Sequence, residues 1–461
     1  MLCLGEIGRR GDLSDHKALQ SVILGAMDGS EDEKSAASFA LGNVAVGNVE
    51  KFLPSVLKEI KDTPKKQYLL MHSLEEVSSQ IFYFSLFLLV SSRRFLLNYQ
   101  QIITRSTGTD GVKALMPYLG SVLELLFENT ESEEEGTRNV VAKCLGKFAL
   151  ISPKDLIPAL QKRVGDASPL TRATVVTAAK FAIVDYPHEV DGALQPVIGD
   201  FLNLLRDKDL VSTHFSSNHP FLTCCKISIQ KDTRRAALLT LNYAAHNKPT
   251  LIRPVLVEYL EPLYEETKVK EELIKIVNLG PFKHKVDEGL ENRKVAFECM
   301  YTLLDTCIDK VDISTFTKHL VAGLDDVYDI KLLCFLMLSR LAQHAGPALV
   351  TGESARANVA FLLILKKQKK KTSLALDSLV EPLKKTLTTK VRDTAVKQQV
   401  DRNDELIRSA LVAIAAISRI EDVDSSLKFD EFIKQNVKTG PHAEAFEAIL
   451  KETAPKQNES S

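Results

Sequence analysis

Apolar residues recur at helical spacing in three segments, 137–153, 171–187 and 233–249, and these segments repeat one another. Each begins with Thr-Arg, continues with aliphatic residues on one helix face, and reaches a proline after about 16 residues. The first two segments are offset by about 34 residues, a period typical of proteins built from stacked helical repeats. We therefore predict one helix in each segment, with the proline as its end.

A second kind of segment lies between these helices, at 156–160, 194–202 and 252–256, and each carries a proline near its start. Proline is favoured in the first turn of a helix, where its missing N–H has no partner to lose, so these segments are predicted helix starts. The repeating unit is then a helical hairpin, which cannot bury its apolar face alone. The pattern predicts an all-α fold, an α-solenoid of stacked helical hairpins.

Helical spacing of apolar residues continues along most of the remaining chain. We predict further helices at 14–27, 32–43, 49–60, 67–77, 112–126, 293–307, 313–324, 330–341, 376–387, 404–420, 429–437 and 443–450. The first eight residues resemble the end of a helix and not a secretory signal, so we expect the chain to begin inside a longer solenoid. The polar residues 451–461 are predicted to be a disordered tail.

One segment changes its period from that of a helix to that of a strand. Residues 273–279 lead into Gly280-Pro281, and residues 282–287 then alternate apolar or aromatic with basic residues. Glycine followed by proline fits a tight reversal, so the segment predicts a β-hairpin at about 274–287. The alternative is an irregular long loop. A two-stranded ribbon is marginally stable alone, so it must rest on its neighbours or on a partner.

Three segments interrupt the helical pattern, at about 80–101, 211–233 and 345–371. The apolar run 81–90 in the first is too short to span a membrane, which leaves a buried helix or an insertion. The second contains Cys224 and Cys225 near two histidines, but this spacing does not close a tetrahedral metal site, so a loop is predicted. The third contains the basic run 366–371; a solvated loop is favoured over a nuclear-targeting or anion-binding segment.

The composition is that of an ordinary globular protein, and no cofactor is predicted. The 461 residues contain 59 basic and 60 acidic side chains, so overall charge does not favour nucleic acid or a membrane as partner. The seven cysteines form no C-x-x-C pair, and we expect buried free thiols in a reducing compartment. The sequence has no phosphate-binding glycine loop, zinc-protease motif or nucleophile elbow, so we predict neither an enzyme nor a metal site.

Four segments, 136–142, 244–249, 280–284 and 296–305, closely resemble the C-terminal third of the cullin-associated, neddylation-dissociated family, also described as TATA-binding-protein-interacting. The resemblance covers nearly the whole chain outside the three interruptions. The composition of these interruptions is closer to untrimmed noncoding sequence in a gene model than to evolved loops. It implies HEAT-type repeats at 1–190 and C-terminal repeats of the TATA-binding-protein-interacting type at 191–450. It also implies a protein of the cytoplasm and nucleus that binds the N-terminal region of an unneddylated cullin.

In this family the projecting hairpin occupies the site of the substrate-receptor adaptor, so that receptors are exchanged among cullin-RING ubiquitin ligases. The resemblance therefore implies these partner-binding residues: Ile276, Leu279, Gly280, Pro281, Phe282, Lys283, His284, Lys285 and Val286. The family's long N-terminal arch has no counterpart here, so autonomous inhibition of neddylation is not expected. Composition and repeats alone also fit a transport receptor, a phosphatase scaffold or a TATA-binding-protein-interacting transcription regulator of the same solenoid type.

Overall fold

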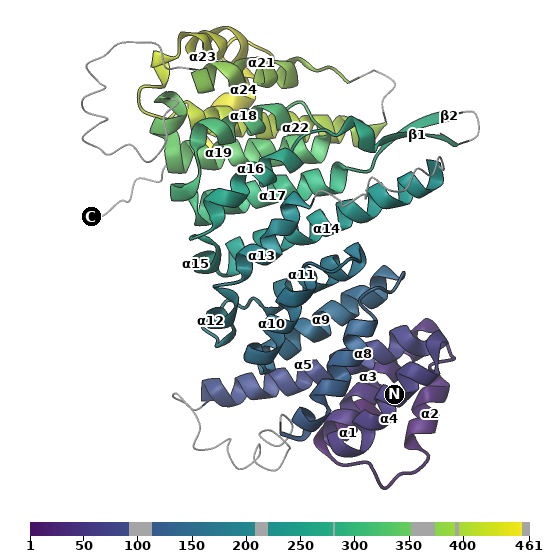
Figure 1. Ribbon diagram of the computed structural model, residues 1–461. Helices are drawn as coiled ribbons and strands as arrows, with labels where there is room; N and C mark the ends of the chain where they lie inside the picture. The colour runs from purple at the N-terminus through teal and green to yellow at the C-terminus, as the bar shows by residue number, and fades with distance from the viewer. Residues whose placement is uncertain (92–112, 208–219, 280–281, 352–373, 392–395, 454–461) are drawn as a thin grey trace, which may run out of the picture. The chain divides into compact units, whose positions relative to one another are not determined.

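The computed structural model describes residues 1–91, 113–207, 220–279, 282–351, 374–391 and 396–453. Helices make up most of these residues, and the described part contains one sheet, of two strands. The predicted α-solenoid of HEAT-type hairpins with a single β-hairpin is confirmed (Figure 1). The chain forms two compact units, Met1–Leu251 (unit 1) and Ile252–Ser461 (unit 2). The domain boundary expected after residue 190 followed the resemblance and stays a prediction.

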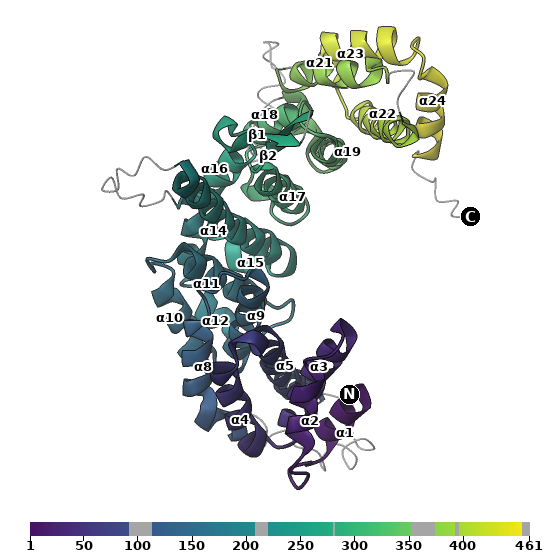
Figure 2. The same cartoon turned by 90° about the vertical axis from the view of Figure 1, so that its right-hand side faces the viewer.

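Unit 1 stacks its helices in two layers. Its helices are α1 (Leu2–Arg10), α2 (Leu19–Ala26), α3 (Glu31–Gly47), α4 (Val49–Asp62), α5 (Gln67–Ser91), α8 (Leu119–Glu128), α9 (Glu135–Ile151), α10 (Pro153–Arg163), α11 (Pro169–Ala182), α12 (Val190–Leu194), α13 (Ile198–Leu202) and α14 (Pro220–Asn247), followed by α15 (Pro249–Ile252). Helices α1, α3, α5, α9, α11 and α14 each pack on the next. Figure 2 shows α8 and α10 on the opposite side of this unit from α5 and α9.

Local signals in the sequence explain where several of these helices begin. Ser30 and Glu33 form a capping box at the start of α3, in which each side chain accepts a hydrogen bond from the other residue's backbone N–H. Asn48 caps α4 in the same position. Pro153, predicted to end one helix, is also the first residue of the next, because proline suits that position.

Hydroxyl groups link neighbouring helices in the row that runs from α1 to α14 of unit 1. The Ser73 hydroxyl on α5 donates to the carbonyl of Ser38 on α3 at 2.9 Å. The Thr240 hydroxyl on α14 donates to the carbonyl of Val176 on α11 at 3.2 Å. Both hydrogen bonds are buried, and each stabilises the stack by about 1 kcal/mol. These bonds fix the register of one repeat against the next.

An arginine near the start of α11 ties two repeats together. The Arg172 guanidinium donates to the Asp207 carboxylate at 2.8 and 3.1 Å, and to the carbonyl of Asp166 at 2.8 Å. Its counterpart Arg138 donates to carbonyl groups in the turn before its own helix, at 2.6 and 3.0 Å. The third arginine, Arg234, was predicted at a helix start; this is wrong, because α14 begins at Pro220 and continues through it.

Replacing Arg172 with alanine should lower the free energy of unfolding of unit 1 by about 2 kcal/mol, because Asp207 would lose its charged donor. Thermal unfolding measures this. The control is Arg10→Ala, whose side chain is 75% exposed and whose ion pair with Glu6 should contribute less than about 0.5 kcal/mol. An unchanged melting temperature of Arg172→Ala would refute a structural role for Arg172.

Unit 2 is also built from packed helices, and it carries the sheet. Its elements are α16 (Leu256–Glu266), β1 (Ile274–Leu279), β2 (Phe282–Asp287), α17 (Leu290–Thr306), α18 (Ile313–Gly323), α19 (Tyr328–Thr351), α21 (Leu374–Thr388), α22 (Lys397–Ile417), α23 (Leu427–Phe432), a π-helix (Ile433–Val437) and α24 (Ala443–Glu452). By length and composition the α19 stretch Tyr328–Val350 could cross a membrane, but half of that stretch is buried. It packs against α17, α18, α21 and α22 as a core helix.

The predicted interruptions are partly helical. Helix α5 continues to Ser91, and α19 continues to Thr351 with a kink at Ala345. A loop was predicted at about 211–233, but residues from Pro220 onward are helical; the prediction was wrong there because proline in a polar segment can also start a helix. His214, His219 and the basic run 366–371 lie outside the described residues, as do the side chains of Cys224 and Cys225.

Candidate partner-binding site

The predicted β-hairpin is present in unit 2. Strands β1 and β2 pair antiparallel with a continuous register from Ile274 opposite Asp287 to Leu279 opposite Phe282. Two residues, Gly280 and Pro281, connect the strands and lie outside the described part of the chain. Figure 1 shows the two strands extending beyond α17, the helix that follows them. The strand alternation noted in the sequence therefore predicted both strands correctly.

The register divides the hairpin into two faces, because residues directly opposite each other in an antiparallel pair point to the same side. On one face Val277 pairs with His284, and Val286 pairs with Lys275. On the other face Ile276 pairs with Lys285, and Asn278 pairs with Lys283. The hairpin therefore has one face with two valines and a histidine, and one with an isoleucine between lysines.

The described side chains of the predicted site are exposed. Ile276 is 69% exposed, Val277 40% and Val286 43%, while Lys283, His284 and Lys285 are also exposed. The side chains of Leu279 and Phe282 lie outside the described part of the structure. Val277 and Val286 are exposed together on one face of the ribbon and Ile276 on the other, and adjoining exposed apolar side chains mark interaction sites. The hairpin therefore presents apolar contact area beside positive charge.

A buried arginine anchors the base of the hairpin. The Arg293 side chain on α17 is 2% exposed and donates to the Asp326 carboxylate at 2.6 and 2.9 Å, and to the Asp287 carboxylate at 2.8 Å. Burial opposes its charge, but the hydrogen bonds with Asp326 and Asp287 outweigh it and raise the pKa of Arg293. Asp287 is the last residue of β2, and Asp326 lies in the turn between α18 and α19, so this triad joins the strand pair to α17 and to that turn.

The sequence analysis missed Arg293 and Asp326. A signal was available: Arg172 and Asp207 are 35 residues apart and Arg293 and Asp326 are 33 apart, so the same ion pair recurs one repeat apart in both units. In the first pair the arginine joins two repeats, and in the second it also holds the hairpin. The period of the repeats thus positions an arginine at the base of the hairpin.

Further contacts immobilise the base of the hairpin while the strands extend outward. Lys275 on β1 forms an ion pair with Glu288 at 2.7 Å. The backbone N–H of Glu288 donates to the carbonyl of Leu273, whose side chain is buried. A Cβ on Gly289 would lie 3.0 Å from the Leu273 side chain, so this position packs closely. The base is therefore rigid, as a preorganised binding element requires.

The described residues contain no group of three or more metal-ligating side chains. Cys144, Cys299, Cys307 and Cys334 are buried as predicted, whereas Cys3 is exposed. Burial, followed by the nearby charge of Glu75, raises the pKa of the Cys144 thiol to about 12, so this thiol is not a ready nucleophile.

Stacked helical hairpins with a projecting strand pair define this chain as a HEAT-type solenoid scaffold. Residues 251–437 match the family model described as TATA-binding protein interacting (TIP20). Cullin-associated NEDD8-dissociated protein 1 from Dictyostelium discoideum is 45% identical over 99% of this chain. The Arabidopsis thaliana protein of the same name is 42% identical over 98%. The protein from Emericella nidulans named as the C-terminal part is 32% identical over 85%.

The chain belongs to the cullin-associated NEDD8-dissociated family. It spans 32% of the Dictyostelium and Arabidopsis relatives and 30% of the Emericella one. A crystal structure of importin beta aligns with 95% of this chain and 46% of its own at a TM-score of 0.49 and 12% identity. That likeness is too weak to bear on function.

Proposed function

We propose that this chain is a non-enzymatic scaffold that binds unneddylated cullins and competes with substrate-receptor adaptors. In the cell it would promote receptor exchange in cullin-RING ubiquitin ligases, in the cytoplasm and the nucleus. The observation that carries the proposal is the hairpin: Ile276, Val277 and Val286 are exposed on a ribbon whose base is fixed by the buried Arg293. The name of the relatives, cullin-associated, supplies the partner.

The hairpin suits competition for one surface of a partner. Its aliphatic side chains would be desolvated on binding, and Lys283 and Lys285 on one face would meet carboxylates of the partner. Because the base is rigid, little conformational entropy is lost when the ribbon docks. A ribbon that fills the adaptor's contact surface excludes the adaptor sterically, so binding of the two would be mutually exclusive.

A second candidate follows from the family model. Its description, TATA-binding protein interacting, covers residues 251–437 and therefore includes the whole hairpin. On that basis the same ribbon would contact the TATA-binding protein in a transcription regulator. The two candidates differ in the partner and not in the surface, so one experiment with both partners separates them.

The test is isothermal titration of the full chain with an unneddylated cullin N-terminal region, with and without saturating adaptor, and in parallel with the TATA-binding protein. We expect binding to the free cullin region and at least a tenfold weaker apparent affinity in the presence of adaptor, as direct competition requires. Binding that is unaffected by adaptor would reject competition. Binding to the TATA-binding protein alone would favour the second candidate.

A further inference from the structure

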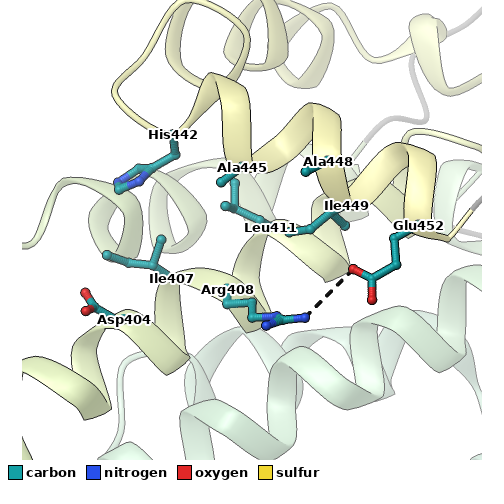
Figure 3. A pocket seen from close by; sticks show the side chains of 9 residues that line it. All are labelled: Asp404, Ile407, Arg408, Leu411, His442, Ala445, Ala448, Ile449 and Glu452. Atoms are coloured by element: carbon teal, nitrogen blue, oxygen red, sulfur yellow. Dashed lines mark ion pairs between the residues drawn. The ribbon is translucent and has the colours of Figure 1, made fainter.

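A groove lies between α22 and α24 in unit 2, away from the strands of the hairpin. Two adjoining cavities, of about 460 and 600 Å³, share Asp404, Ile407 and His442, so they form one continuous groove. Figure 3 shows Ile407 and Leu411 of α22 facing Ala445, Ala448 and Ile449 of α24 across the first cavity. The second cavity extends the groove past His442 to the end of α21.

The floor of the groove is apolar and firmly packed. Leu411 is 1% exposed and Ile449 6%, so both belong to the core of the unit. Ala445 and Ala448 are exposed on the wall, and their small side chains permit close approach of another backbone. His442 Nε2 lies 3.2 Å from the carbonyl of Leu387, which joins the start of α24 to α21. The groove is therefore a preformed surface.

The charges along the groove are unequal at its two ends. In the second cavity Lys384 and Lys390 are exposed, and among the described residues neither has a carboxylate within ion-pair distance. At the other end Arg408 and Glu452 already form an ion pair at 3.8 Å (Figure 3). Asp404 lines both cavities and lies between the two ends of the groove. With two lysines and one carboxylate lining the second cavity, net positive charge remains at the end formed by α21.

We propose that this groove is a docking site for an amphipathic helix of a partner protein, with an acidic residue at the end that lies over Lys384 and Lys390. The floor of the groove is apolar on both sides of the residues that the two cavities share. A helix that presents aliphatic side chains at i, i+3 or i+4, and i+7 could bury them along such a floor. The negative end of the helix dipole would add to the attraction of the two lysines. The site is independent of the hairpin and of the cullin proposal.

The test uses the full chain and a displayed library of random 16-residue peptides as probe. We expect enriched peptides with three aliphatic residues at helical spacing and Asp or Glu in the last turn. Binding of the best peptide should weaken at least thirtyfold in Ile407→Asp, because a carboxylate would enter the apolar floor. Val257→Asp, an exposed residue on α16, is the matched control and should bind normally.

Since Ile407→Asp could also loosen the fold, a charge-reversal variant provides the second arm. Lys384→Glu with Lys390→Glu changes only exposed side chains, and selection on it should enrich peptides with Lys or Arg in place of the acidic residues. Peptides that bind all variants equally, or an unchanged charge preference, would overturn the proposal. Self-association of the chain that Ile407→Asp abolishes would also overturn it, because the occupant would then be a second copy.

Discussion

Replacing Arg293 with alanine is expected to lower the free energy of unfolding of unit 2 by about 3–5 kcal/mol. The guanidinium is 2% exposed, and its loss would leave the Asp326 carboxylate, 7% exposed, without its charged donor. Asp287 would lose its hold on α17 at the same time. Thermal or denaturant unfolding of the variant measures the global effect, and hydrogen exchange of the β1 and β2 amides measures the local one.

The matched control is the neighbouring Lys294→Ala. Lys294 forms an ion pair with Asp329 at 2.8 Å, but its side chain is 28% exposed, so the change should cost less than about 1 kcal/mol. Faster exchange of the hairpin amides in Arg293→Ala, and not in Lys294→Ala, would show that the triad holds the ribbon. Unchanged protection of those amides in both variants would contradict this role of Arg293.

Phe282→Ala is expected to weaken displacement of an adaptor from a cullin about thirtyfold, which corresponds to about 2 kcal/mol. Phe282 is paired with Leu279 at the outer end of the register, beyond the exposed Val277 and Ile276. Aromatic residues surrounded by apolar and cationic neighbours are frequent interface hot spots. Because the base of the hairpin is unchanged, the melting temperature should stay the same.

The measurement is displacement of a labelled adaptor from an unneddylated cullin by the wild-type chain, by Phe282→Ala and by Val257→Ala. Val257 is 51% exposed on α16 and is the control for loss of an exposed hydrophobic side chain elsewhere in unit 2. All three proteins must show the same melting temperature. Equal displacement by Phe282→Ala and wild type would assign the interaction to other surfaces of the solenoid.

The period of apolar residues predicted the helices well, because each hairpin buries one face against the next. The ranges 49–60 and 313–324, for example, appear as α4 (Val49–Asp62) and α18 (Ile313–Gly323). The strand pair could be predicted equally well, since the alternation of residues and the Gly-Pro turn are local signals in the sequence. The predicted helix boundaries were wrong where a proline can either end or begin a helix. Pro220 begins α14 inside a segment whose polar residues indicated a loop.

The support of the site could not be deduced from local pattern. Arg293 and Asp326 are 33 residues apart, and their contact depends on how one repeat stacks on the next. Whether such an arginine is buried or exposed follows from packing and not from its neighbours in sequence. The groove between α22 and α24 could not be predicted for the same reason. Ile407 and Ala445 belong to separate helices, and nothing in the spacing of apolar residues in either helix indicates that they meet.

The most direct test of the proposed function is the affinity of an unneddylated cullin N-terminal region for this chain with and without residues 280–284. Deletion of the outer end of the hairpin leaves Arg293 and its two aspartates in place, so the melting temperature should change little. We predict that the deletion weakens cullin binding at least thirtyfold, the loss of one hot spot or more. Binding of the deleted chain with the wild-type affinity would contradict the account.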